Sequence, residues 1–189
     1  MKICVIGCGG IGSFTAQFVD RLLKYNQLEN CEITFYDDDT IEHKNLMYQN
    51  FENSELGDFK TEALEFKYDN IKYISRRVEK SMLNKYELFI LCVDNNPIRR
   101  DVYDHCKNSY KKFIDARANG RQVGIFSSDT ENYLDTLSKS DDSHSCQLEY
   151  QIKAHKVELG NVIIASILTQ HILTYVRTSE LPFDYIATF

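Results

Sequence analysis

The feature that most constrains the fold is a glycine-rich loop near the start of the chain. Residues 2–6 are mostly apolar, as in a strand buried on both faces, and GCGGIG follows at residues 7–12. Apolar residues then recur at helical spacing over residues 14–23. This context matches G-x-G-x-x-G, in which glycines permit a sharp turn and the helix N-terminus favours phosphate. The loop predicts a nucleotide-binding fold without separating a dinucleotide from ATP, and a plain strand-to-helix turn is the alternative.

Strand-like and helix-like segments alternate along the rest of the chain. We expect further strands at 32–36, 70–78, 88–93 and 112–116, a hairpin arm at 121–127, and helices at 96–108 and 157–177. Asn96 and Pro97 are the expected N-cap and first-turn residues of the middle helix. Residues 128–147 are rich in Ser and Asp and predict a mobile loop. Together these elements predict one α/β domain over residues 1–189, a Rossmann-like, doubly wound, mostly parallel sheet with a C-terminal hairpin and helix.

Charge and composition argue against several classes of protein. A net charge of −6 and a pI of about 5.4 provide no basic surface for a phosphate backbone, so nucleic acid is not an expected partner. No apolar run approaches the roughly 20 residues of a membrane span. The N-terminal residues lack a signal-peptide pattern, and the six cysteines include no Cys-x-x-Cys pair. We therefore expect a cytoplasmic protein with no membrane contact, zinc knuckle or disulfide framework.

An acidic stretch, DDDTIE at residues 37–42, directly follows the second predicted strand. Asp37 lies about 25 residues after Gly12, near the place where a Rossmann protein carries the acid that binds the ribose hydroxyls. An NAD(P)-dependent oxidoreductase would need that acid but not the rest of the stretch. We therefore expect the acidic residues to lie at the end of this strand, next to the glycine loop. The oxidoreductase remains an alternative.

Four motifs, taken together and in this order, strongly resemble the ThiF/MoeB family of adenylating enzymes, relatives of the ubiquitin-activating enzymes. They are the glycine loop, the acidic stretch with Asn45-Leu46 and Gln49 behind it, Lys60 after Gly57, and Cys92-Val93-Asp94-Asn95 with Arg99 downstream. The matches run from Ile3 to about Arg99, roughly half of the chain.

The resemblance implies ATP- and Mg²⁺-dependent adenylation of a carboxylate, usually the C-terminus of a small ubiquitin-like or sulfur-carrier protein, by a homodimer. It implies that Asp37 binds the ribose, that Asp94 binds the Mg²⁺, and that Lys60 and Asp94 are catalytic. The implied nucleotide-binding residues are Gly7, Gly9, Gly10, Gly12, Asp37, Asp39, Asn45, Gln49 and Lys60. Such a reaction joins a carboxylate to a highly anionic nucleotide, so a metal and a lysine are needed to neutralise charge.

The sequence departs from the family pattern at three points. Tyr48 stands where the family has an arginine that clamps phosphate, and a hydroxyl donates a hydrogen bond but carries no positive charge. The family's N-terminal helix, with an arginine donated across the dimer, and its two Cys-x-x-Cys zinc pairs have no match in this sequence. We therefore expect slow or absent adenylation with Tyr48 in the catalytic site, and a non-catalytic relative that binds nucleotide or a partner is the second alternative.

Many relatives pass the activated carboxylate to a cysteine thiolate. Cys146 in the polar loop is the candidate here, because His144 is close enough in sequence to lower its pKa. An inert surface cysteine is the simpler interpretation. Cys106 lies in a predicted helix and is a weaker candidate, and Cys4 and Cys92 lie in strands and are expected to pack in the core.

Two arginines flank the predicted hairpin turn at Asn119 and Gly120. Arg117 and Arg121 follow a strand end, which in an open sheet faces the ligand crevice. One of them could replace the missing phosphate clamp or bind an acidic tail, and a solvated hairpin is the equally weighted alternative.

Overall fold

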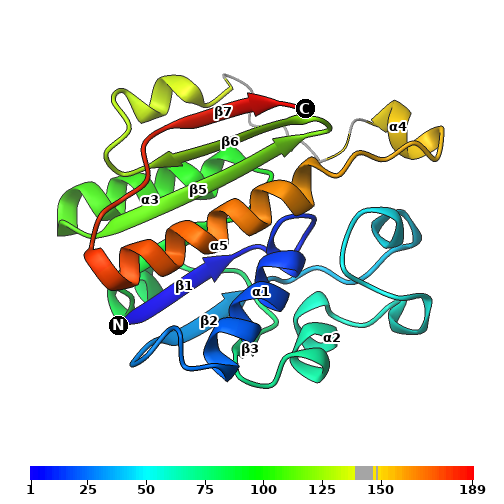
Figure 1. Ribbon diagram of the computed structural model, residues 1–189, viewed down its shortest axis with the longest axis horizontal. Helices are drawn as coiled ribbons and strands as arrows, with labels where there is room; N and C mark the ends of the chain where they lie inside the picture. Colours follow the sequence, from blue (N-terminus) through cyan, green and yellow to red (C-terminus); the bar gives the residue numbers. More distant parts are fainter. Residues whose placement is uncertain (139–146, 148) are drawn as a thin grey trace.

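A computed structural model describes residues 1–138, 147 and 149–189, and in this part of the chain seven strands form one sheet (Figure 1). The strands are β1 (Lys2–Ile6), β2 (Glu32–Tyr36), β3 (Lys72–Ile74), β4 (Leu88–Leu91), β5 (Lys112–Asn119), β6 (Gln122–Ser127) and β7 (Tyr185–Thr188). Their order is β3-β2-β1-β4-β5-β6-β7. The first five strands pair in parallel, and β6 pairs antiparallel with β5 and β7. The expected mostly parallel α/β sheet with a C-terminal hairpin is confirmed.

The strand order determines where a ligand crevice forms. From β1 the chain moves outward to β2 and β3 and then returns to β4, on the other side of β1. In open α/β sheets the crevice lies at such a reversal, outside the carboxyl ends of the strands. The glycine loop follows β1 and Asp37 follows β2, so both lie at this edge.

Helices cover both faces of the sheet. They are α1 (Gly12–Lys24), α2 (Lys60–Lys67), α3 (Asn96–Ser109), α4 (Glu149–Lys153) and α5 (Gly160–Thr178), with short 3-10 helices η1 (His43–Met47), η2 (Asn53–Glu55), η3 (Lys80–Lys85) and η4 (Tyr133–Thr136). Side chains of β1 alternate between two cores: Ile3 and Val5 pack with α1 and α5, and Cys4 and Ile6 pack with α3. Figure 1 shows α1 and α5 in front of the sheet and α3 behind it. Among the described residues no helix is long and apolar enough to cross a membrane.

The ends of several elements differ from the sequence-based predictions: β4 ends at Leu91, β5 runs to Asn119 and α5 begins at Gly160. The strand expected at 70–78 is limited to Lys72–Ile74, and the polar residues after it lie on the surface. Asn95, not Asn96, caps α3, because its side-chain Oδ1 accepts a hydrogen bond from the N–H of Ile98 at 3.3 Å. Pro97 occupies the first turn as expected, whereas Asn96 is already helical and buried.

Residues 128–138 are the described start of the predicted mobile loop, most of whose remainder lies outside the described residues. They contain η4, in which Tyr133 is 1% exposed and packs against the rings of Tyr103 and Phe113. Strand β7 was also not predicted. Its four residues complete the sheet by pairing with β6, a contact between segments about sixty residues apart that no local pattern indicates.

Candidate functional site

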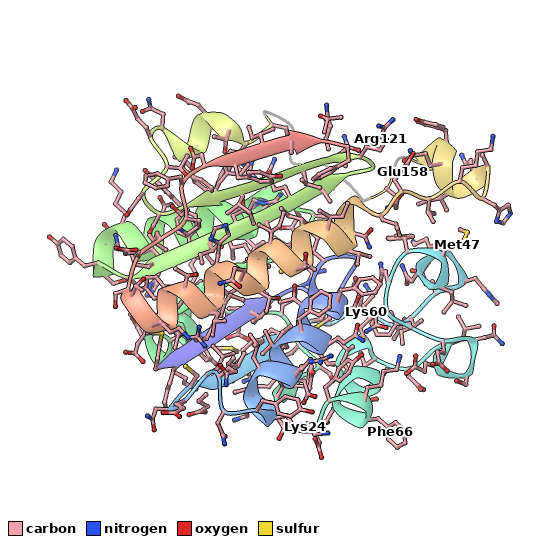
Figure 2. The ribbon with its side chains drawn as sticks, viewed as in Figure 1. Lys24, Met47, Lys60, Phe66, Arg121 and Glu158 are labelled. Atoms are coloured by element: carbon pink, nitrogen blue, oxygen red, sulfur yellow. The ribbon has the colours of Figure 1, made fainter. Side chains whose placement is uncertain are left out.

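A cleft of about 1320 Å³ opens at the carboxyl ends of β1, β2 and β4. Ten of the residues selected from the sequence line it: Gly7, Gly9, Gly10, Asp37, Asp39, Asn45, Tyr48, Gln49, Lys60 and Asp94. Figure 2 shows Lys60 beside the loop that follows β1. Gly12 does not line the cleft, and Cys146 and His144 lie outside the described residues. Five separate segments of the chain therefore meet at one site.

The glycine loop is packed too tightly for side chains at two positions. Gly7 has φ +99°, and a Cβ atom there would lie 2.7 Å from the carbonyl oxygen of Cys92. A Cβ atom on Gly12 would lie 1.9 Å from the carbonyl oxygen of Gly7. Gly7 thus lets the loop approach the end of β4, while Gly12 lets α1 begin against the loop. The structure places Gly12 in packing and leaves Gly7, Gly9 and Gly10 facing the cleft.

The Asp37 carboxylate connects β2 to the glycine loop. Its Oδ2 accepts a hydrogen bond from the N–H of Cys8 at 2.6 Å, and its Oδ1 accepts one from the N–H of Asp39 at 2.8 Å. Burial raises the pKa of Asp37 above its usual range, and Lys60 and the two N–H donors oppose this rise. Asp37 is thereby fixed next to the loop, where a polar hydroxyl of a ligand could reach it.

Lys60 is a buried cation and not a solvated helix lysine. Its side chain is 7% exposed, and its Nζ donates to Asp39 Oδ2 at 2.7 Å. Its backbone N–H also bonds to the Asp39 carbonyl at 3.0 Å, which fixes the start of α2 against the acidic stretch. Burial alone lowers the pKa of Lys60, but the carboxylates of Asp37 and Asp39 outweigh it and raise that pKa above the usual value. The cleft therefore contains a lysine ammonium that is held in place by a carboxylate.

The segment from η1 to Gln49 forms the wall of the cleft that faces the glycine loop, and we call it the Tyr48 wall. Asn45 is buried, and its Oδ1 accepts a hydrogen bond from the N–H of Glu42 at 2.8 Å. Gln49 is 8% exposed, and its Oε1 is buried without a hydrogen-bond partner among the described residues. Since buried polar atoms are nearly always paired, this oxygen is suited to accept a hydrogen bond from a ligand in the cleft. Tyr48 is buried at the same wall.

Carboxylates near the loop differ in whether they are already paired. Asp37, Asp38 and Asp39 bring carboxylate oxygens within 4.8 Å of one another, a spacing compatible with a metal ion. However, Asp38 accepts a hydrogen bond from Arg77 at 2.8 Å and Asp39 pairs with Lys60. Asp94 is exposed three residues beyond the end of β4 and makes no ion pair within the described chain. Of these acids, Asp94 is the most available to a cation.

The structure adds residues that were not predicted from the sequence, two of them in the cleft lining and one behind its walls. Arg76 and Arg77 line the cleft after β3, and their only sequence signal is a basic pair behind a short strand. Asn161, at the start of α5, reaches the cleft walls from behind, where its Nδ2 donates to the carbonyl oxygens of Gly10 and Tyr48. A single asparagine in an apolar helix gave no signal, because its partners lie far away in the sequence.

Comparison with known proteins identifies the family. A family model described as the ThiF family matches residues 1–186. The chain belongs to the ThiF family. The resemblance predicted from the sequence is therefore confirmed, and it extends over nearly the whole chain. A comparison with curated proteins gave no match.

Solved structures share the fold of this ThiF-family chain at low sequence identity. E. coli MccB with MccA-N7isoASN superposes with a TM-score of 0.73 at 17% identity, covering 100% of this chain and 61% of that one. E. coli MccB with ATP gives 0.68 at 18%, covering 100% and 60%. PaaA gives 0.67 at 14%, also covering 100% and 60%. The chain thus spans about 60% of the length of these structures.

Neither of the two arginines near the β5–β6 turn lines the cleft: Arg117 lies within β5, which runs to Asn119 and not to 116 as predicted, and Arg121 lies in the turn. Arg117 donates to Asp115 Oδ2 at 2.8 Å and to the Thr136 carbonyl at 2.8 Å, and its guanidinium lies 4.2 Å from the centre of the Phe126 ring. These contacts hold it in the fold, so the idea that Arg117 replaces the phosphate clamp is wrong for this arrangement. Arg121 is exposed on the hairpin and does not line the cleft (Figure 2).

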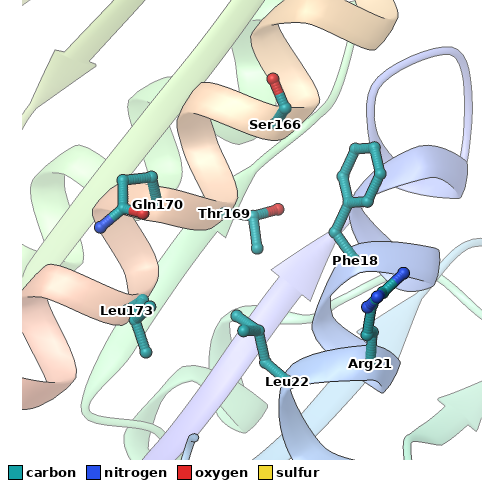
Figure 3. Close-up of a pocket in the computed structure, with 7 residues that line it drawn as sticks. All are labelled: Phe18, Arg21, Leu22, Ser166, Thr169, Gln170 and Leu173. Atoms are coloured by element: carbon teal, nitrogen blue, oxygen red, sulfur yellow. The ribbon is translucent and has the colours of Figure 1, made fainter.

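A second, smaller hollow lies in the helix layer, away from the strand ends of the ThiF cleft (Figure 3). It measures about 220 Å³ and lies between α1 and α5. Its lining residues are Phe18, Arg21, Leu22, Ser166, Thr169, Gln170 and Leu173. They include no carboxylate, so this hollow offers no acid–base pair, and the larger cleft remains the candidate functional site.

Proposed function

We propose that this protein binds ATP with Mg²⁺ in the cleft and transfers AMP to a carboxylate of a peptide or small protein. By the family resemblance, the acceptor is the C-terminus of a ubiquitin-like or sulfur-carrier protein and the enzyme is a homodimer. The observation that carries the proposal is the meeting of ten predicted residues in one cleft. Membership of the ThiF family and the shared fold with MccB, whose solved structures include complexes with ATP and with MccA, also support it.

The proposed chemistry assigns a role to Lys60. One oxygen of the acceptor carboxylate attacks the α-phosphorus, the bond from that phosphorus to the bridging oxygen breaks, and pyrophosphate leaves with the electron pair. Negative charge increases on the leaving group in the transition state, and a fixed cation there lowers the barrier. Lys60 is buried, protonated and fixed by Asp39 at 2.7 Å, so it need not reorganise during the reaction.

The charge of the cleft supports the proposed need for Mg²⁺. The acidic side chains among its lining residues, Asp37, Asp38, Asp39, Glu42, Asp94 and Asp101, outnumber the basic ones, Lys44, Lys60, Arg76 and Arg77. A triphosphate therefore meets a cleft with net negative charge and is repelled unless it brings a cation. Asp94, exposed and unpaired in the described chain, offers oxygen ligands of the kind Mg²⁺ prefers. Mg²⁺ bound there would neutralise phosphate charge.

ATP–pyrophosphate exchange with candidate carrier proteins and peptides tests the proposal. We expect Lys60→Ala to lower exchange by about 10²-fold or more, as removal of one charge-stabilising group typically does. Lys67→Ala is the matched control, because Lys67 lies on the same helix, pairs with Glu55 at 2.7 Å and does not line the cleft. Equal exchange rates in the Lys60→Ala and Lys67→Ala variants would show that Lys60 is not catalytic.

A non-catalytic nucleotide-binding relative is the second candidate function. The observation that favours it is Tyr48, a neutral residue in the wall of the cleft where the resembling family carries a charge. Under this alternative, ATP binds normally and no acceptor supports exchange of pyrophosphate. The NAD(P)-dependent oxidoreductase is less favoured, because it leaves Asn45, Gln49 and Asp94 without a role.

A further inference from the structure

Asn161 connects two walls of the cleft from behind. Its side chain is 1% exposed at the start of α5, and its Nδ2 donates to the Gly10 carbonyl at 3.1 Å and to the Tyr48 carbonyl. Gly10 belongs to the glycine loop and Tyr48 to the opposite wall. One amide group therefore uses both of its N–H bonds to fix the distance between two segments that are far apart in the chain.

The orientation of this amide is determined by its other contact. Asn161 Oδ1 accepts a hydrogen bond from Gln147 Nε2 at 3.4 Å. Gln147 is itself fixed to the backbone of Glu158 by two bonds, Nε2 to the carbonyl at 2.6 Å and Oε1 from the N–H at 2.9 Å. Because both carbonyl partners of Asn161 need a donor, only the orientation with Nδ2 toward them satisfies every group.

The bond to the Gly10 carbonyl also orients the start of α1. A trans peptide unit is planar, so fixing the Gly10 carbonyl directs the N–H of Ile11 to the opposite side of that peptide unit. Ile11 is the N-cap residue of α1, and the first N–H groups of a helix are the ones that bind phosphate. Loss of the Asn161 donor would free this peptide unit to rotate.

We propose that Asn161 is a positioning residue that holds the glycine loop and the Tyr48 wall at the separation required by the phosphate chain of ATP. This inference rests on the proposed nucleotide binding and adds to it. Asn161 does not line the cleft and would act only through the position of the glycine loop, so its contribution should increase with the number of phosphates in the ligand and should be small for adenosine.

Asn50 provides a matched control for a purely structural role. Its N–H donates to Ser13 Oγ at 3.1 Å, and its Nδ2 donates to the Ser13 carbonyl at 3.4 Å and to Tyr68 Oη at 2.8 Å. Asn50 thus connects the same wall to α1, but it does not line the cleft and bonds to no glycine-loop residue. Asn50→Ala should destabilise the fold without altering the loop.

Calorimetric titration of wild type, Asn161→Ala and Asn50→Ala with adenosine, AMP and ATP–Mg²⁺ tests the inference, and thermal melting measures stability in parallel. We expect Asn161→Ala to raise the Kd of ATP about 10-fold or more and that of adenosine less than about 3-fold. Asn50→Ala should leave the ratio of these two Kd values as in wild type. If Asn161→Ala does not fold, Asn161→Ser, which keeps one donor, is measured by the same ratio.

The outcomes separate this inference from the proposed function. Wild type that binds no ATP overturns the proposed function and the inference with it. Wild-type binding of ATP with an unchanged Kd ratio in the Asn161 variants overturns the inference alone. An equal loss of affinity for adenosine and ATP in these variants also overturns it, because that pattern indicates general destabilisation of the site.

Discussion

At the scale of single residues, Tyr48 is the most informative position in the cleft. The resembling family has an arginine there that neutralises charge as pyrophosphate leaves. We expect Tyr48→Arg to raise the rate of ATP–pyrophosphate exchange, by about 10²-fold if the added charge acts as such groups typically do. If the variant instead abolishes a robust activity of the wild type, Tyr48 itself contributes to catalysis, and the family arginine has no equivalent role at this position.

The cysteines provide a second prediction at the residue scale. Burial raises the pKa of the Cys106 thiol to about 12. Because pH 9 lies below this pKa, the thiolate fraction increases about tenfold for each pH unit there. We expect Cys106 to react slowly with iodoacetamide at pH 7.5 and progressively faster up to pH 10, without a plateau. Cys146 should react faster at pH 7.5, and His144→Ala should slow it. Peptide mass spectrometry measures both rates, and equally slow reaction of both would make Cys146 an inert thiol.

At the scale of elements, a buried ion network joins β5 to α3 and η4. Asp115 is fully buried, pairs with Arg99 at 3.1 Å and Arg117 at 2.7 Å, and accepts a hydrogen bond from Tyr133 at 2.8 Å. Arg99 Nη2 also donates to the Val93 carbonyl at 2.6 Å, next to Asp94. The network therefore supports the loop that carries Asp94, and it connects η4 to β5 through Tyr133 and Thr136.

Asp115→Asn should destabilise the fold strongly, because it leaves two guanidinium groups without their carboxylate. Breaking a buried ion pair in this way costs about 3–5 kcal/mol. The control is Asp129→Asn, since Asp129 pairs with Lys112 at 2.7 Å on the surface and such pairs contribute about 0–1 kcal/mol. Urea denaturation gives both free energies of unfolding. Similar small losses in the two variants would show that the Asp115 network contributes little to stability.

At the scale of the whole molecule, the net negative charge of the cleft and the family membership together favour ATP with Mg²⁺ over NAD⁺ as the ligand. We expect ATP with Mg²⁺ to raise the melting temperature and NAD⁺ to leave it unchanged. At 100 times the Kd, binding contributes about 2.7 kcal/mol, or about 5–10 °C for a domain of this size. Removal of Mg²⁺ with EDTA should decrease the rise in melting temperature that ATP causes. A larger shift with NAD⁺ than with ATP would favour the oxidoreductase.

Local sequence patterns were enough to predict most of the elements and much of the site. Strand β1, the glycine loop and α1 follow from an apolar run, a glycine spacing and a helical period, which depend on residues adjacent in the chain. Parallel strands deliver the residues after their carboxyl ends to one edge of the sheet. The resemblance to the ThiF/MoeB family implied one nucleotide site for Asp37 and Asp94, and both residues line the cleft at this edge.

The pairing of the buried polar groups, in contrast, depends on tertiary structure. The Asn161 bond to Gly10 spans 151 residues, and the burial of Lys60 depends on how the acidic stretch folds over α2. Strand β7 likewise pairs with β6 without any local pattern that indicates the contact. Each segment carries its own conformational propensity, but the energy of a buried hydrogen bond or charge depends on its partners. Those partners are set only when distant segments pack together.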